Sequence, residues 1–127
     1  MCTKTKRRTK EPAINMDAGL LRQIRWALRK AETEAQALAV DECLDIARLS
    51  RKWLQEKGIE TTMYVGMCEW NSADAMPLPL HAHYWLTLDN GFIIDLSINE
   101  CYGTTVLPYI IDPTQSKIKY TVHGKMS

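Results

Sequence analysis

The sequence lacks any apolar run that approaches the ~20 residues needed to span a bilayer, so a membrane-spanning helix is not expected. No hydrophobic segment follows the basic segment MCTKTKRRTK, which therefore does not have the pattern of a secretory signal. The cysteines also lack the close paired spacing of zinc fingers or of a disulfide framework. They are Cys2, Cys43, Cys68 and Cys101. We therefore expect a cytoplasmic protein with reduced thiols.

Positive charge is scarce outside the first ten residues. Five of the 16 basic side chains lie in residues 1–10, which leaves 11 basic and 15 acidic residues in the rest of the chain. A nucleic-acid binder usually carries a basic face on its folded body, so nucleic acid is not the expected partner. We interpret residues 1–12 as a disordered basic arm, which either only solvates the chain or weakly binds a partner. Residues 13–127 are then one domain, long enough to bury a sizeable core.

Glycine and proline are absent between Leu20 and Lys57, and the apolar residues there recur at helical spacing. A helical pattern from Asp17 to Lys57 is too long for one typical globular helix, so we expect a break. Asp41 is the best candidate to cap a second helix, because its carboxylate can accept exposed backbone N–H groups. Gly58 is expected to end that helix.

After Gly58 the pattern changes to one typical of strands. We expect strands over Thr61–Cys68 and Ile118–Val122, a loop over residues 71–79, two strands within residues 81–98, and a short strand or turn over Val106–Ile111. Helices followed by an antiparallel sheet indicate an α+β fold.

The stretch HAHYWLTLDNGFIIDLS, residues 81–97, predicts a hairpin whose register follows from its apolar residues. Side chains alternate between faces, and a three-residue loop, Asp89–Gly91, keeps the apolar sets of both strands on one side. Leu88 then faces Phe92, and Trp85 faces Asp95. On the other, more polar face, His83 and Asp95 become diagonal neighbours within side-chain reach. They form either a functional pair or an ordinary surface pair.

Cys43 is the candidate nucleophile, because it lies in the first turn of the second predicted helix. Backbone N–H dipoles and a nearby imidazolium favour a thiolate there, and the same N–H groups could hold an oxyanion. Two flanking acids, Glu42 and Asp45, are expected to oppose ionisation. The alternative is that Cys43 is a small core residue.

Two segments together resemble transglutaminase-like, papain-type proteins. CLDIARLSRKWLQEKGIETTMYVGM is similar to that family's cysteine helix and following strand, and AHYWLTLDNGFIIDLS to its His-x-Trp strand and Asp-bearing strand. The resemblance covers about Glu42 to Leu107 and is closest to small bacterial members, including the maturation proteases of lasso-peptide pathways. It implies that Cys43 is the nucleophile, His83 the general base and acid, and Asp95 the residue that orients His83.

Such a triad would perform acyl transfer on a peptide or amide substrate without a cofactor. Cys43 would attack the carbonyl and form a thioester. Water would then make the protein a peptidase or amidase, and an amine would make it a transglutaminase-like acyltransferase. Trp85 is the candidate to shield the site from water or to contact the substrate, and the alternative is a plain core role. A protein partner or a second copy of the chain could complete so small a site.

Two other readings of the same residues remain open. His81 and His83 share a strand face and could bind a metal with Asp95, Cys68 or Cys101. Alternatively, the chain is a non-catalytic binding or dimerisation module that keeps the fold while Cys43 stays inert.

Overall fold

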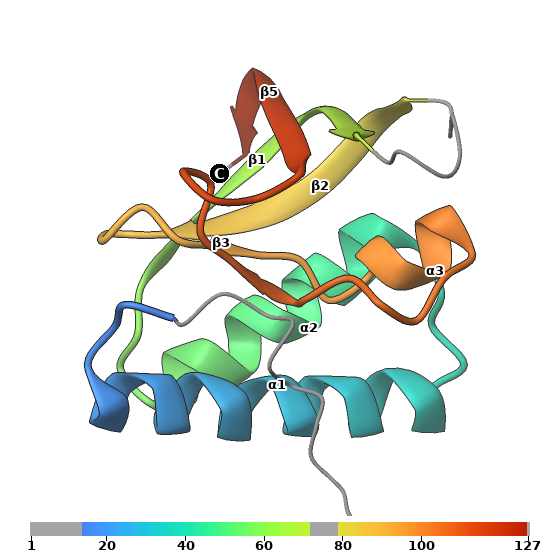
Figure 1. The fold of residues 1–127 in the computed structure, drawn as a ribbon. Coiled ribbons are helices and arrows are strands. Elements are labelled where there is room, and N and C mark those ends of the chain that lie inside the picture. Colours follow the sequence, from blue (N-terminus) through green and yellow to red (C-terminus); the bar gives the residue numbers. More distant parts are fainter. Residues whose placement is uncertain (1–13, 72–78, 127) are drawn as a thin grey trace, which may run out of the picture.

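The structure, a computed structural model, describes residues 14–71 and 79–126 (Figure 1). In chain order the elements are α1 (Ala18–Ala37), α2 (Cys43–Glu56), β1 (Thr61–Trp70), β2 (Leu80–Leu88), β3 (Ile93–Ile94), α3 (Ile98–Tyr102), β4 (Ile110–Ile111) and β5 (Ile118–Met126). The strands form one five-stranded antiparallel sheet in the order β4-β3-β2-β1-β5. The predicted α+β fold is confirmed. The predicted arm, residues 1–12, and residues 72–78 of the predicted loop lie outside the described residues.

The helical region contains the expected break, but its second helix begins later than predicted. The Asp17 carboxylate caps α1 by accepting the N–H of Leu20 at 3.0 Å. α2 begins at Cys43, with Glu42 at the cap position and no capping bond from that side chain. Asp41 is therefore not the cap. The chain reverses instead through Ala39, whose φ of 56° is left-handed, so that the turn comes from the backbone rather than from a capping carboxylate.

The two long helices cover one face of the sheet, as Figure 1 shows. Their apolar faces and the facing strand residues bury a core of ten residues, Ile24, Ala27, Leu28, Ala47, Leu54, Met63, Leu86, Leu88, Phe92 and Ile94. A second, smaller core lies on the other face of the sheet and contains Cys68, Trp85, Ile93, Ile98, Ile111 and Ile118. β2 therefore has buried side chains on both faces.

The predicted hairpin register is confirmed. Leu86 pairs with Ile94, and the N–H of Leu88 donates to the carbonyl of Phe92 at 2.9 Å, which is the alignment of a three-residue loop. The second strand is shorter than expected, because β3 ends at Ile94 and the chain turns into α3. Ile98, expected on that strand, is buried from α3 instead. A buried apolar residue after Asp95 fits both a longer strand and a short helix, so the pattern alone did not separate them.

The face expected to be more polar is instead buried. His83 and Asp95 are each only 2% exposed, and Trp85 on the same face is 1% exposed. The pair is therefore not an ordinary surface pair, since buried charged groups are rare unless they are paired.

Gly66 in β1 marks a close approach between β1 and β5. A Cβ atom at this position would lie 1.9 Å from the backbone oxygen of Thr121, whereas one at Gly124 would lie no closer than 3.5 Å to Val65 Cγ1. We predict that Gly66→Ala lowers the free energy of unfolding by about 2–3 kcal/mol, because the strands must part. Gly124→Ala, in the same strand pair, should stay within about 1 kcal/mol of the wild type. Urea denaturation measures both, and equal losses would contradict the prediction.

Candidate active site

A bulge at the start of β2 decides where His83 points. His83 pairs with Gly66 and Leu80 pairs with Cys68, so β2 has one residue more than β1 over this interval. Ala82 lies within it at a φ of 53°, a left-handed conformation that a non-glycine residue rarely adopts. The strand bends there, leaving His81 exposed and His83 buried. Two histidines that strict alternation would place on one face are thus separated.

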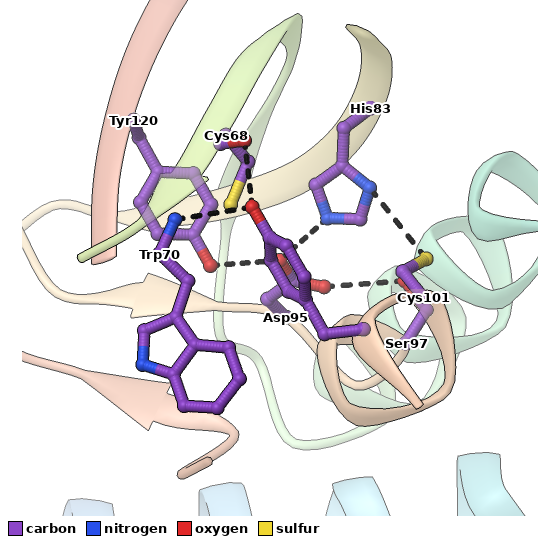
Figure 2. Close-up of polar contacts among 8 residues, drawn as sticks. Cys68, Trp70, His83, Asp95, Ser97, Cys101 and Tyr120 are labelled. Atoms are coloured by element: carbon purple, nitrogen blue, oxygen red, sulfur yellow. Dashed lines mark hydrogen bonds and ion pairs between the residues drawn. The ribbon is translucent and has the colours of Figure 1, made fainter. Parts of the chain in front are cut away.

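His83 and Asp95 form a short buried ion pair. His83 Nε2 lies 2.7 Å from Asp95 Oδ2, and both side chains are at most 2% exposed (Figure 2). Asp95 directly follows β3, so the end of that strand presents its carboxylate to β2. Two hydroxyls also donate to the carboxylate: Ser97 Oγ to Oδ1 at 3.2 Å and the Tyr120 hydroxyl to Oδ2 at 2.8 Å. The carboxylate thus has hydrogen-bond donors on both oxygens, as a buried charge requires.

Cys43, the first residue of α2, brings its thiol to the same imidazole. The hydrogen bond to the His83 ring lowers the pKa of the Cys43 thiol; burial opposes this effect, and the backbone N–H of Tyr84 adds to it. β3 pairs with β2 only at Leu86 and Thr87, so Tyr84 lies on a stretch of β2 that β3 does not cover. The helix start and this open edge of β2 meet at the thiol.

The flanking acids do not act as expected from the sequence. The negative charge that raises the Cys43 pKa is that of Asp95, not that of Glu42 or Asp45. Asp45 is exposed and lies 3.9 Å from Arg48, so solvent and a counter-charge screen it.

The same contacts favour the charged form of His83. Burial alone would lower its pKa, but the hydrogen bonds to Asp95, Cys101 and Cys43, together with the Asp95 charge, hold it well above the ordinary value. A lowered thiol pKa and a raised imidazole pKa both shift the pair toward thiolate and imidazolium. Because Asp95 holds Nε2, Nδ1 is the nitrogen that remains for a thiol.

A second thiol also faces His83; the sequence predicts Cys101 near the histidines only as a possible metal ligand. Cys101 Sγ lies 4.0 Å from His83 Nδ1 (Figure 2), and this cysteine is exposed, whereas Cys43 is half-buried. Cys101 belongs to α3, the helix missing from the prediction. Tyr102 holds α3 against β1, because its hydroxyl donates to the carbonyl of Cys68 at 2.9 Å and accepts from the N–H of Trp70 at 3.1 Å.

Trp85 packs the site from inside rather than lining it. Its indole lies 6.1 Å from the His83 ring in a stacked arrangement and 4.8 Å from the Tyr120 ring. At 1% exposure it offers no surface to a substrate, which corrects the prediction that it contacts one. Its buried position agrees with the other prediction, that it excludes water from the pair.

The metal-site reading loses support from the same geometry. His81 is exposed and turned away from His83 by the bulge. Across residues 14–71 and 79–126 there is no group of three or more histidine, cysteine, aspartate or glutamate side chains that could hold a metal ion.

The sequence-based predictions do not identify Tyr120 and Ser97 as hydrogen-bond donors to Asp95. Ser97 is two residues after Asp95, and its alternation in the predicted strand placed it on the same face as Asp95, so a signal was present. Tyr120 comes from β5, and its alternating strand was predicted, but no local pattern indicates which residue of another strand it reaches.

The comparison with protein families agrees with this α+β fold. Residues 2–104 match the family model of the transglutaminase-like superfamily. The chain belongs to this superfamily. No curated protein and no solved structure gives a significant match. Among the described residues of this transglutaminase-like chain, no helix is both long and apolar enough to cross a membrane.

The paired pKa changes predict how stability depends on pH. Between ~pH 6.5 and ~8.5 an unfolded histidine is neutral and an unfolded cysteine is protonated. Folded His83 then holds a proton that the unfolded chain lacks, which makes the free energy of unfolding fall as pH rises. The lowered pKa of Cys43 acts in the opposite sense, because the folded thiol loses its proton at a lower pH than the unfolded one. In the wild type the two effects oppose each other. In Cys43→Ser only the histidine effect remains. We therefore predict that, as pH rises, the free energy of unfolding of this variant falls relative to that of the wild type by up to about 1.4 kcal/mol per pH unit.

Urea denaturation across this pH range measures the difference. Cys101→Ser is the matched control, because it removes the other thiol that faces His83. The pH dependence of its free energy of unfolding should be the same as that of the wild type. A Cys43→Ser profile that also runs parallel would show that Cys43 is not ionised in the folded protein.

Proposed function

We propose that the protein is a cysteine-dependent acyl-transfer enzyme in which Cys43 is the nucleophile, His83 the general base and acid, and Asp95 the residue that orients His83. Two observations carry the proposal: a hydrogen bond to His83 lowers the pKa of the Cys43 thiol, and His83 Nε2 lies 2.7 Å from Asp95 Oδ2. A nucleophile, a base and an orienting acid in this order are the recurring elements of covalent acyl transfer.

In the first step the Cys43 thiolate attacks the carbonyl carbon of an amide or ester. The sulfur–carbon bond forms, and the carbonyl oxygen becomes an oxyanion. The His83 imidazolium then gives its Nδ1 proton to the leaving amine or alcohol as the carbon–heteroatom bond breaks, which leaves a thioester on Cys43. In the second step neutral His83 removes a proton from water or from an amine, which attacks the thioester and restores the thiolate.

The start of α2 supplies donors for the oxyanion. The first N–H groups of a helix have no intrahelical acceptor, and the Glu42 side chain makes no capping bond to them. The positive end of the helix dipole points toward the same place. These N–H groups can therefore stabilise both the thiolate before attack and the oxyanion after it.

We further propose that the substrate is a peptide and that water is the usual acceptor. The ground for proposing hydrolysis is the resemblance of both sequence segments to small bacterial members of the superfamily, including lasso-peptide maturation proteases; the residues themselves do not distinguish hydrolysis from transfer to an amine. The Cys43 thiol is half-buried, which leaves part of its surface open to an extended peptide. A protein partner or a second copy of the chain would then hold the rest of the peptide.

The second candidate is a binding module that keeps this fold without catalysis. One observation favours it: Cys101 also lies near His83 Nδ1, so the nitrogen needed by Cys43 has a competing thiol. The reactivity of the two cysteines separates the candidates.

We predict that Cys43 reacts with iodoacetamide at pH values well below the ordinary thiol pKa of ~8.5, because the hydrogen bond to His83 favours the thiolate. His83→Ala should slow this reaction at least about tenfold near neutral pH by returning the thiol pKa toward its ordinary value. Mass mapping of the labelled peptides identifies the modified cysteine. Cys101→Ser should leave the rate at Cys43 nearly unchanged. A Cys43 that remains unlabelled in the folded wild type would support the binding module instead.

We also predict that an activated peptide ester acylates Cys43. Intact-mass spectrometry should detect the thioester, and His83→Ala should slow its formation by about 10²–10⁴-fold, the usual contribution of a general acid–base catalyst. Cys43→Ala should abolish the adduct. Adding a primary amine then tests the acceptor: release of free acid in its presence indicates a hydrolase, and an amide product indicates an acyltransferase. The absence of any adduct on Cys43 would overturn the proposed function.

A further inference from the structure

We propose that Tyr120 is a positioning residue that acts on His83 through the Asp95 carboxylate. The inference rests on the proposed function, because His83 must take part in the reaction for its position to matter. The Tyr120 hydroxyl donates at 2.8 Å to Asp95 Oδ2, the same oxygen that His83 Nε2 contacts at 2.7 Å (Figure 2). Tyr120 also lies beyond residue 104, where the match to the superfamily ends.

Tyr120 reaches Asp95 from the opposite edge of the sheet. It lies on β5, the edge strand, whereas Asp95 follows β3, and both β1 and β2 lie between them. Its partner on β1 is Cys68, a small and fully buried side chain that leaves room for the phenol to extend across the sheet. The Tyr120 ring then packs against Trp85 on β2, with ring centroids 4.8 Å apart. This packing fixes the ring, and with it the position of the hydroxyl.

The hydroxyl completes the restraint of the carboxylate. Ser97 holds Oδ1 at 3.2 Å, and Tyr120 and His83 share Oδ2, so the group cannot rotate without losing donors. Tyr120 remains a neutral donor, because burial and the charge of Asp95 raise its pKa well above the ordinary value.

Besides the Ser97 hydroxyl, titratable groups from four elements surround this carboxylate. They are His83 of β2, Cys68 of β1, Tyr120 of β5 and Cys43 of α2. Burial raises the pKa of Cys68 to about 12, so it is a neutral thiol. Cys43 and His83 are the groups in this set whose pKa values move toward the charged forms, and the Tyr120 hydroxyl acts on them as a neutral donor.

Removing the Tyr120 hydroxyl should therefore change the pKa of Cys43 in one direction. Without this donor the carboxylate either turns away from His83 or draws the shared proton closer to itself. In both cases less positive charge remains on the imidazole that faces Cys43, and the pKa of Cys43 rises. A purely structural role would lower stability without moving this titration.

The experiment measures the rate at which full-length protein reacts with iodoacetamide at Cys43 as a function of pH. We expect Tyr120→Phe to move the pH midpoint of the labelling rate upward by about 0.5–1 pH unit. Below that midpoint, labelling of Cys43 would be ~3–10-fold slower than in the wild type. Tyr102→Phe is the matched control: its hydroxyl is also hydrogen-bonded, but to the backbone of β1, and its midpoint should equal that of the wild type. Circular dichroism confirms that each variant is folded.

A second variant covers the case in which Tyr120→Phe does not fold. Replacing Tyr120 by 3-fluorotyrosine keeps the ring and makes the hydroxyl a stronger donor, so the midpoint should move downward. A folded Tyr120→Phe or fluorotyrosine variant with the wild-type midpoint overturns the positioning role, and so does an equal shift in Tyr102→Phe. These results leave the proposed function intact. A wild-type Cys43 that does not react at all refutes the proposed function itself.

Discussion

The ion pair between His83 and Asp95 is the interaction on which the rest of this site depends. Both side chains are almost fully buried, and a buried charge without compensation is far too costly to keep. The fold supplies compensation from several directions: the imidazole from β2, one hydroxyl from Ser97 and another from β5. Removing one partner would leave the other charge unpaired. The pair and its hydroxyl donors therefore restrain β2, the end of β3 and β5 relative to one another. Its cost is a reason to expect function, since ordinary packing would favour apolar residues here.

The short length of β3 makes this arrangement possible. β3 pairs with β2 at only two positions, so most of β2 has no strand neighbour on that side. Asp95 enters this space directly after the strand, and the start of α2 brings Cys43 to it. A longer β3 would satisfy the backbone of β2 with its own carbonyl and N–H groups. The N–H of Tyr84, which contributes to the lowered pKa of Cys43, would then have a different partner.

Much of this could be predicted from the sequence, because the determining patterns are local. Apolar alternation in residues 81–98 determined the hairpin register, and the absence of glycine and proline identified the helical region. The left-handed turns at Ala39 and Ala82 could not be foreseen, since alanine gives no signal for a positive φ. The short α3 was also missed, because Ile98 is buried equally well from a strand or a helix. As a result, Cys101 was considered only as a metal ligand and not as a neighbour of His83.

The site changes in character from its solvent side to its interior. Cys101 is exposed and Cys43 is half-buried, whereas Asp95, Cys68 and Trp85 are buried. The sulfurs of Cys43 and Cys101 therefore lie on the accessible side of the site, whereas His83 and Asp95 are almost fully buried. This asymmetry suits the proposed acyl transfer, because a substrate would meet the Cys43 sulfur first, and the charge that holds the imidazole stays in a dry, weakly screened environment. The buried end needs only to keep its geometry, and it does so with neutral donors rather than with a second cation.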